Sequence, residues 1–171
     1  MQKKLFSSER LDYYKLDSEH FEDFCAMDMD ADVMKFYTNR PHGTREYAQA
    51  SFQRYDDYMS KHPYLGGFVA FSKDDRRFVG LGVLIHLELN PSNKDYEVGY
   101  RLPKSSWGHG YATEICNALI DYGFNTLGFN EILGTTNPEH IVSQKVLLKC
   151  GLVKIGSSSN YGGSTVFKIT K

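Results

Sequence analysis

The sequence predicts a mixed α/β domain built around one sheet of about seven strands. Short apolar runs typical of strands alternate with longer segments whose apolar residues recur every three or four positions, as on a helix. Three predicted strands, 67–71, 78–89 and 96–102, follow one another without a helix between them. This meander argues against a doubly wound parallel sheet. The length of 171 residues suits a single domain spanning 1–171.

The first predicted elements are a strand and two helices. Arg10–Leu16 is the first strand. Ser18 is placed to cap a helix that runs to about Asp28, and Thr44 is placed to cap a second helix. The second helix should end near His62-Pro63, because the residue before a proline is disfavoured in a helix.

The middle of the chain predicts three strands and then a helix. Gly67–Phe71 and Phe78–Leu89 are apolar, and Asn90–Lys94 has the composition of a turn before the strand Tyr96–Leu102. From Gly110 onward the spacing becomes helical. The apolar stripe of this helix consists of Ala112, Ile115, Cys116, Leu119 and Tyr122.

The C-terminal part predicts a strand, a helix and a final hairpin. Ile132–Thr136 is a short strand, and Asn137-Pro138 is typical of the N-cap and first residue of a helix that Gly151 ends. The last two strands and the loop between them are Leu152–Ile155, Thr165–Ile169 and Gly156–Ser164. The expected element order is therefore βααβββαβαββ.

Composition argues against several classes of protein. The formal net charge of −1 lacks the basic balance of a nucleic-acid-binding domain. No apolar run reaches the ~18–20 residues that span a bilayer, and the N-terminus does not have the pattern of a secretory signal. Cys25, Cys116 and Cys150 lie too far apart for a zinc site or a disulfide framework. We expect a soluble, cytoplasmic protein with no metal and no nucleic-acid or membrane partner.

The segment between Leu102 and the helix that follows Gly110 is the most informative. It carries two glycines, Gly108 and Gly110, directly before the helix. Glycines let a ligand approach the backbone, and the first N–H groups of a helix have no partner within it. With the helix dipole they favour a pyrophosphate site. The spacing matches neither a Walker loop nor a Rossmann fingerprint, and the alternative is an ordinary turn.

Glu97 is a candidate general base. It lies inside an apolar strand, where a carboxylate costs free energy unless it is paired, hydrated or functional. The alternative is a structural carboxylate paired with Arg101 on the same face or with His86 across the hairpin. The register stays open, because Glu97 opposes Leu87 in one pairing and His86 after a one-residue slip.

Polar residues gather at the start of the last predicted helix. Asn137 is a candidate N-cap, and His140 and Ser143 should face roughly the same way. The Ser143 hydroxyl could donate a proton to a departing thiolate, or it could be an ordinary solvated helix residue. Lys145 is either a surface lysine or a phosphate contact.

Four blocks of the sequence match one known family in order and spacing. They are Tyr96-Glu-Val-Gly-Tyr-Arg-Leu, Trp107-Gly-His-Gly-Tyr-Ala-Thr-Glu, Asn137-Pro-Glu-His-Ile-Val-Ser and Val146-Leu-Leu-Lys-Cys-Gly-Leu. Together they resemble the GNAT superfamily of N-acetyltransferases, specifically the branch of the ribosomal-protein N-terminal acetyltransferases. Ser8-Glu-Arg-Leu and Asp32-Val-Met-Lys-Phe also resemble that branch. Ser105 and His140 depart from it, since the superfamily often has Gln or Arg at the first position and the branch usually has Asn at the second.

The resemblance implies a three-layer GNAT-like fold, in which a twisted mixed sheet has helices on both faces and its fourth and fifth strands splay apart around acetyl-CoA. The pantetheine would pair with the backbone at the end of the fourth strand, and the pyrophosphate would bind amides of the glycine loop. The residues implied to bind the cofactor are Tyr100, Arg101, Leu102, Trp107, Gly108, His109, Gly110, Tyr111, Ala112, Thr113, Asn137, His140 and Lys145. Whether Asn137 or His140 makes its contact stays open.

The resemblance further implies direct transfer of an acetyl group from acetyl-CoA to a primary amine, with Glu97 as general base and Ser143 as possible general acid. The acceptor would be a protein N-terminus or a small-molecule amine, bound between Ser18–His62 and the loop near Tyr161. The protein would be a monomer or a homodimer. The alternative is a non-catalytic acyl-CoA-binding sensor or interaction module on the same fold.

Overall fold

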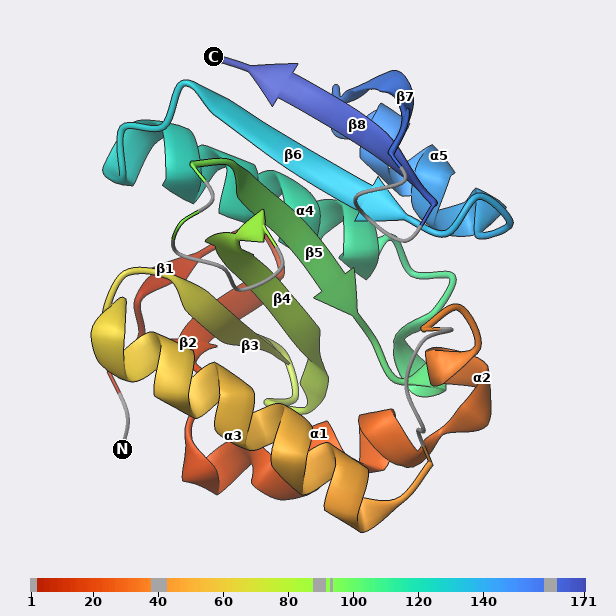
Figure 1. Cartoon of the computed structure of the whole chain (residues 1–171). Helices are drawn as coiled ribbons and strands as arrows, with labels where there is room; N and C mark the ends of the chain where they lie inside the picture. The colour runs from red at the N-terminus through yellow and green to blue at the C-terminus, as the bar shows by residue number, and fades with distance from the viewer. Residues whose placement is uncertain (1–2, 38–42, 88–91, 93, 159–162) are drawn as a thin grey trace.

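The computed structural model describes residues 3–37, 43–87, 92, 94–158 and 163–171, which form an eight-stranded sheet with helices on both faces (Figure 1). The strand order is β1-β2-β3-β4-β5-β6-β8-β7. The strands are β1 (Phe6–Ser7), β2 (Leu11–Lys15), β3 (Gly66–Ser72), β4 (Phe78–His86), β5 (Tyr96–Arg101), β6 (Glu131–Thr136), β7 (Val153–Ser158) and β8 (Ser164–Thr170). The α-helices are α1 (Phe21–Met29), α2 (Ala31–Met34), α3 (Arg45–Lys61), α4 (Tyr111–Asp121) and α5 (Ile141–Lys149). The predicted mixed α/β architecture is confirmed.

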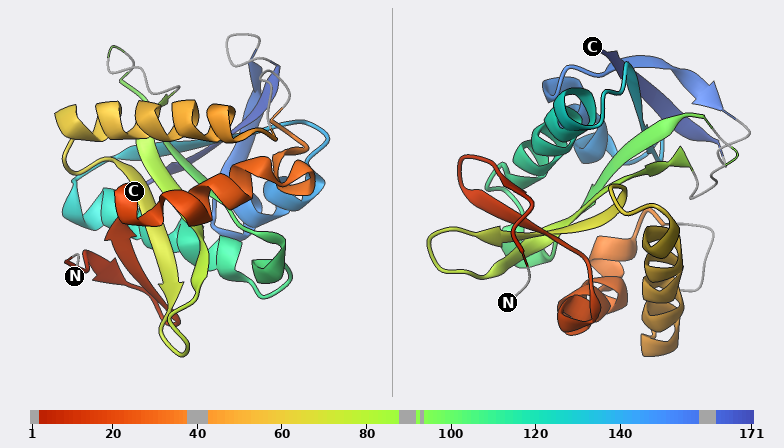
Figure 2. Two further views of the ribbon diagram at one scale, coloured as in Figure 1. Left: turned by 90° about the horizontal axis from the view of Figure 1, so that it is seen from below. Right: turned by 90° about the vertical axis from the view of Figure 1, so that its left-hand side faces the viewer.

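The sheet is the central layer of three. Helices α1 and α3 lie on one face and α4 and α5 on the other (Figure 2). Gly82 of β4 allows α4 to pack closely, because a Cβ atom there would stand 2.6 Å from Leu119 Cδ1. Gly134 of β6 does the same for α5, since its Cβ would stand 2.8 Å from Leu147 Cδ2. Small residues on the strands thus let both helices approach the sheet.

Strand β5 joins the two halves of the sheet. With β4 it forms an antiparallel ladder of six residue pairs, which runs from Leu81–Arg101 to His86–Tyr96. With β6 it runs parallel, and the ladder between them has one residue pair, Glu97–Leu133, within the described residues. The two strands then diverge toward their C-terminal ends (Figure 1). This is the splayed pair that the resemblance implied, shifted by one in chain order because β1 precedes it.

The N-terminal boundaries differ from the prediction. Strand β1 and helix α2 were not predicted, because elements of two and four residues are too short to show a periodic pattern. Asp17 rather than Ser18 caps the first helical segment, since its carboxylate accepts the N–H of Glu19 at 2.9 Å and a 3₁₀ turn precedes α1. Thr44 is the N-cap of α3, as predicted.

The start of α5 is also different from the prediction. The side chain of Asn137 accepts the N–H of Glu139 at 2.9 Å, and the helix begins at Ile141 with His140 as its N-cap. A local bond of this kind competes with helix formation, so Asn137 holds a turn in front of the helix instead of capping it. Gly151 follows the helix end with a φ of +86°, as predicted for a C-terminal cap.

Two predicted strand ends moved. Strand β4 ends at His86, so Leu87 lies beyond the strand that was predicted to include it. The rest of the expected continuation, residues 88–89, and most of the turn 90–94 lie outside the described residues. Strand β7 continues to Ser158, so the first residues of the predicted loop belong to a strand. The position expected of Tyr161 lies outside the described residues.

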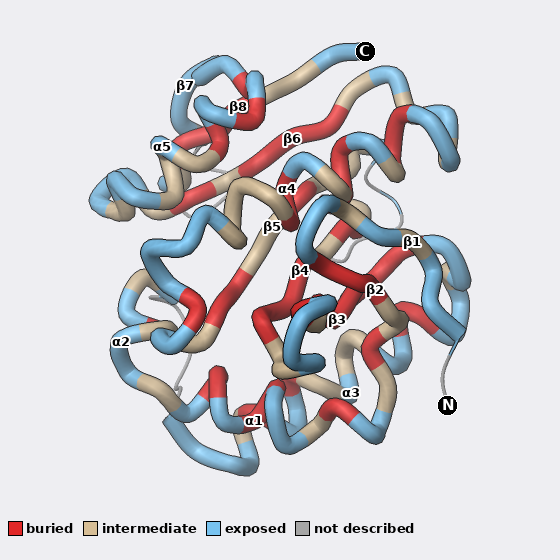
Figure 3. Tube along the Cα trace, turned by 180° about the vertical axis from the view of Figure 1, so that it is seen from behind, coloured by how far each residue is buried: buried red, intermediate tan, exposed pale blue. Residues whose placement is uncertain are grey.

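Buried residues follow the strands and the inward faces of the helices (Figure 3). Tyr13, Phe24, Phe68 and Phe167 are among the largest fully buried side chains. Asp28 is a charged exception, with none of its surface exposed. Among the helices of the described residues, none is long and apolar enough to cross a membrane.

Candidate active site

Strand β5 presents alternate side chains to the two helical layers. Arg101 faces the layer of α1 and α3, because its guanidinium pairs with Asp28 of α1. Tyr100 faces the other layer, because its hydroxyl bonds to Ser143 of α5. Glu97 shares the face of Arg101, being four residues away on the same strand. The candidate base and the candidate acid therefore approach the splayed pair from opposite faces of the sheet.

Glu97 is half-buried at the point where β5 and β6 are still paired. It opposes Ile85 on β4, so both registers considered from the sequence, with Leu87 and with His86, were wrong. The hydroxyl of Thr135 on β6 donates a hydrogen bond to Glu97 Oε1. This hydrogen bond holds the Glu97 carboxylate at the point where β5 and β6 begin to separate. Thr135 was not identified from the sequence.

Arg101 forms a buried ion pair instead of the predicted alternative pairing with Glu97. Its Nη2 lies 2.6 Å from Oδ1 of Asp28, and the side chains are 8% and 0% exposed. The guanidinium also lies over the ring of Phe24, 5.1 Å from its centroid. The side chain is thus committed to the core, and the backbone is what Arg101 can offer a cofactor.

Tyr100 and Ser143 connect β5 to α5. The Tyr100 hydroxyl lies 3.0 Å from the carbonyl oxygen of Ser143 and 3.1 Å from its Oγ. Burial raises the pKa of Tyr100 far above its ordinary value, so the hydroxyl keeps its proton. A protonated tyrosine beside the Ser143 hydroxyl can hold that hydroxyl in one orientation. The side-chain role of Tyr100 was not predicted.

The glycine loop has the geometry of an anion cradle. Gly108 and Gly110 both have a φ of +78°, a conformation that favours glycine. A Cβ atom at Gly108 would meet nothing within 4 Å, so the loop presents open backbone. Gly110 is the N-cap of α4 and gives the helix no side-chain cap. The N–H groups of the first helical residues, Tyr111, Ala112 and Thr113, therefore point out of the helix end.

The side chain of Trp107 ties this loop to the end of β5. Trp107 Nε1 donates to the carbonyl oxygen of Leu102 at 2.9 Å, which closes the loop onto the end of β5. His109 and Trp107 are exposed, and Leu102 is buried. The structure therefore brings the predicted strand end and the predicted glycine loop together.

The predicted contacts on the α5 side are spread apart. His140 is half-buried and stacks on Phe36, with ring centroids 4.2 Å apart, and burial lowers its pKa. Asn137 holds the turn before the helix, and Lys145 is exposed on α5. Phe36 was not predicted as a site residue, and its stacking links the α2 end of the molecule to the start of α5.

Among the described residues, no group of three or more His, Cys, Asp or Glu side chains is arranged to hold a metal ion. The described cysteines Cys25, Cys116 and Cys150 are buried and free.

A mixed sheet with one diverging parallel pair, next to a glycine loop that opens a helix, defines the acyl-CoA-dependent acetyltransferase class of folds. The acetyltransferase (GNAT) domain family matches residues 10–153, and the chain belongs to this family. Enzymes of the family take the acetyl group from acetyl-CoA. The glycine loop and the edge of β5 past its single pair with β6 both expose backbone groups, which are the kind of partner that such a co-substrate can hydrogen-bond.

Known relatives and structures agree with this assignment. The FsC-acetyl coenzyme A-N(2)-transacetylase of Aspergillus fumigatus is 31% identical over 157 residues, and the alignment covers 88% of this chain and 66% of that protein. The ribosomal-protein-S5-alanine acetyltransferase from Vibrio fischeri superposes with a TM-score of 0.73 at 22% identity, over 96% of this chain and 95% of the other. The spermidine N-acetyltransferase from Vibrio cholerae, in complex with CoA and spermine, gives 0.71 at 19% identity, over 94% and 95%. At these identities the two structures support the fold.

Proposed function

We propose that this chain transfers the acetyl group of acetyl-CoA directly to a primary amine, with Glu97 as general base and Ser143 as general acid. The observation that carries the proposal is the placement of the two side chains on opposite faces of the sheet beside the splayed strands β5 and β6. An amine can approach from the face of α1 and α3, where Glu97 lies. A thiolate can depart toward the face of α4 and α5, where Ser143 lies.

The proposed cofactor contacts use the backbone of β5 and the glycine loop. The pantetheine would bind the strand end, Tyr100–Leu102, along the edge that β6 leaves open. The pyrophosphate would bind Trp107–Thr113, and Asn137, His140 and Lys145 would line the α5 side. Acetyl-CoA supplies a thioester carbonyl, which is the carbon that the amine attacks.

Proton movements define the two catalytic roles. A free α-amine has a pKa of about 8 and a lysine-like amine about 10, so most of the acceptor is protonated near pH 7. Glu97 would take the extra proton from the amine, and the hydroxyl of Thr135 would keep the carboxylate in place. Ser143 would give its proton to the departing thiolate while Tyr100 orients its hydroxyl. The attacking nitrogen would lose its second proton to solvent, and Ser143 would regain a proton from solvent.

The acceptor is proposed at the level of its chemistry. The names of the three proteins compared above include an N(2)-transacetylase, a ribosomal-protein-alanine acetyltransferase and a spermidine acetyltransferase. The second name gives a protein as the acceptor, and the third gives spermidine, a small polyamine. A primary amine, on a protein N-terminus or on a small molecule, is therefore the acceptor class we propose.

The test separates binding from turnover in one pair of variants. Glu97→Gln should lower kcat by about 10²–10⁴, the usual contribution of a general base, while acetyl-CoA still stabilises the protein. At 100 times Kd the ligand should add about 2.7 kcal/mol, or on the order of 5–10 °C in Tm. The matched control is Glu131→Gln, a half-buried carboxylate on β6 that pairs with Lys168 at 3.0 Å.

Each outcome has a definite meaning. Normal turnover in Glu97→Gln would remove Glu97 from the mechanism. Ligand-dependent stabilisation of the wild type without thiol release on any amine would favour a non-catalytic acyl-CoA-binding module. No stabilisation at millimolar acetyl-CoA would overturn the proposed use of the site.

A further inference from the structure

The turn between β1 and β2 contacts the start of α4, although about a hundred residues separate them in sequence. Ser8 Oγ donates to Glu114 Oε1 at 2.6 Å, and the backbone N–H of Arg10 donates to the same oxygen at 2.7 Å. Arg10 Nε donates to Glu114 Oε2 at 2.7 Å. Both oxygens of one carboxylate are thus held by the Ser8–Arg10 turn.

Arg10 also reaches the glycine loop itself. Its Nη1 donates to the carbonyl oxygen of His109 at 3.0 Å, between the two glycines. Its guanidinium lies 4.5 Å from the ring centroid of Tyr111, the first residue of α4. One side chain therefore fixes a loop carbonyl and a carboxylate in the first turn of the helix.

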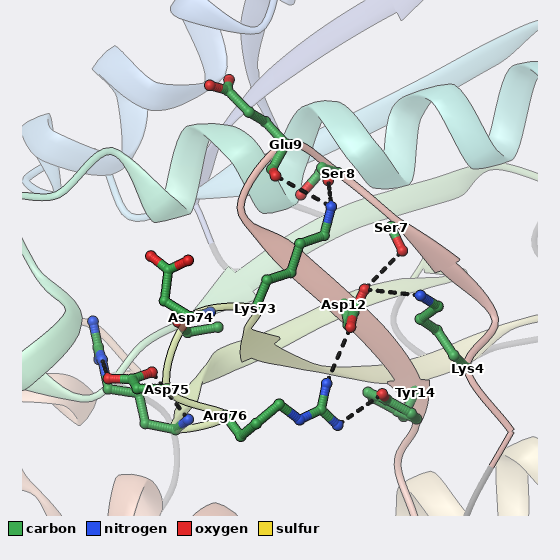
Figure 4. A network of polar contacts seen from close by, with 12 residues as sticks. Lys4, Ser7, Ser8, Glu9, Asp12, Tyr14, Lys73, Asp74, Asp75 and Arg76 are labelled. Atoms are coloured by element: carbon green, nitrogen blue, oxygen red, sulfur yellow. Dashed lines mark hydrogen bonds and ion pairs between the residues drawn. The ribbon is translucent and has the colours of Figure 1, made fainter.

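The Ser8–Arg10 turn is anchored from its other side. Lys73, in the β3–β4 hairpin, donates from Nζ to the carbonyl oxygens of Ser8 at 2.5 Å and Glu9 at 3.2 Å (Figure 4). The backbone N–H of Lys73 donates to the carbonyl oxygen of Arg10 at 3.0 Å. The turn is therefore a fixed support for the glycine loop.

The negative charge of Glu114 would repel a pyrophosphate bound at the start of α4. Burial works to raise the pKa of its carboxyl, but the hydrogen bonds from Ser8 and Arg10 outweigh it and lower that pKa. The carboxylate is therefore charged, and its side chain is 12% exposed. A negative charge in the first turn competes with an anion for the same helix end. The ion pair with Arg10 neutralises the charge of Glu114.

We infer that Arg10 is a positioning residue for the pyrophosphate end of acetyl-CoA. It holds the carbonyl of His109 so that the loop amides stay available, and it cancels the charge of Glu114 beside them. The inference rests on the proposed placement of the pyrophosphate on the glycine loop. The Ser8-Glu-Arg-Leu segment thereby acts on the second, distant block of sequence, Trp107–Glu114.

The test is a double-mutant cycle of Arg10→Gln and Glu114→Gln in which the Kd of acetyl-CoA is measured for each variant. Arg10→Gln should raise Kd about tenfold, because Glu114 stays charged, held by Ser8 and the backbone N–H of residue 10, but loses the cation that neutralises it next to the pyrophosphate. Glu114→Gln should change Kd by less than about threefold. The double variant should recover most of the affinity lost in Arg10→Gln, because the negative charge of Glu114 has been removed as well. Arg76→Gln is the matched control, because Arg76 pairs with Asp12 in the same network without touching the loop (Figure 4).

A purely structural clamp predicts a different pattern. Glu114→Gln would then be as damaging as Arg10→Gln, and the double variant would be no better than either, which would overturn the inference. S-acetylpantetheine, which lacks the pyrophosphate, provides a second readout. Its kcat/KM should be unchanged in Arg10→Gln, and an equal loss with both acetyl donors would also overturn the inference.

One further variant separates this inference from the proposed site. Gly110→Trp should weaken acetyl-CoA binding by about a thousandfold if the pyrophosphate lies on the loop. If Gly110→Trp binds normally, the placement and the inference both fall. If Gly110→Trp loses binding while Arg10→Gln keeps wild-type affinity, the placement stands and the role of Arg10 alone is refuted.

Discussion

The two edges of strand β5 differ in how they are used. The β4 edge carries six residue pairs, whereas the β6 edge carries one pair within the described residues. The backbone N–H and C=O groups of β5 that face β4 form the hydrogen bonds of the sheet. The groups that face β6 beyond Glu97 form no ladder with β6 and can hydrogen-bond a ligand. One strand thus serves both as a structural element and as one wall of the proposed cofactor site.

The polar side chains of the core and those of the proposed site also differ in what they are free to do. Asp28 and Arg101 satisfy each other in the core, where neither can meet a substrate. Glu97 and Ser143 are half-buried and are held by the hydroxyls of Thr135 and Tyr100. Changes to the first pair should therefore cost stability, and changes to the second should cost turnover.

The largest expected effect is on the buried ion pair. Asp28→Ala leaves the Arg101 guanidinium buried without its carboxylate, which typically costs about 3–5 kcal/mol. Denaturant unfolding should report this loss. Asp32→Ala is the control, because it removes an exposed ion pair with Lys104 in the same region and should leave the midpoint unchanged. Equal midpoints for Asp28→Ala and wild type would contradict the structural role of the pair.

Blocking the glycine loop should be the next largest effect. Gly110→Trp should weaken acetyl-CoA binding by about a thousandfold, or about 4 kcal/mol, because the side chain would fill the proposed pyrophosphate cradle. Gly128→Trp controls for backbone strain, since Gly128 has a φ of +74° and lies beyond α4. A Cβ atom at Gly128 would meet nothing within 4 Å, and one at Gly110 would meet only Arg10 Nη2 at 3.6 Å. Titration calorimetry should separate the two variants. Similar affinities in both would place the pyrophosphate elsewhere.

Removing the proposed acid should have a smaller effect. Ser143→Ala should lower kcat by about a hundredfold, the lower end for a general acid, with the KM for acetyl-CoA unchanged. Tyr100→Phe should lower kcat only a few-fold, because Ser143 keeps its own proton. Steady-state kinetics of both variants would decide the order. A larger loss in Tyr100→Phe would transfer the acid role to Tyr100.

The helix ends that depend on residues adjacent in sequence were predicted well. The start of α4 at the glycine loop and the end of α5 at Gly151 follow from local backbone requirements, and both were found where expected. The splayed pair came from the resemblance of ordered blocks rather than from any single motif. The start of α5 was missed because Asn137 can form either a cap or a turn, and only the surrounding structure decides between them.

Contacts between distant segments could not be predicted from the sequence. Thr135 on β6 contacts Glu97 on the neighbouring strand β5, and Asp28 contacts Arg101 from helix α1, which packs on the face of the sheet that the Arg101 side chain occupies. An acidic residue among apolar helix positions was a signal for Asp28, but it did not identify the partner. The register that places Glu97 against Ile85 depends on a turn whose length the sequence leaves open.

The smallest expected effect concerns two histidines, one near each edge of β5. Burial, and next the neighbouring His62, lowers the pKa of His86 below 6.5, and burial lowers the pKa of His140. Folding therefore disfavours the charged form of each imidazole, and the unfolded chain takes up these protons at a higher pH than the folded protein. Stability should therefore be complete above about pH 6.5 and fall as the pH drops below it.

Unfolding midpoints at pH 7.5 and 5.5 test this sign, and His86→Gln and His140→Gln should each reduce the difference. His86 opposes Tyr96 on the paired edge and bonds to the Tyr58 hydroxyl, whereas His140 stacks on Phe36 beside the open edge. Saturating acetyl-CoA should therefore change the contribution of His140 and leave that of His86 as it was. An equal response of both histidines to the ligand would mean that the two edges are not independent.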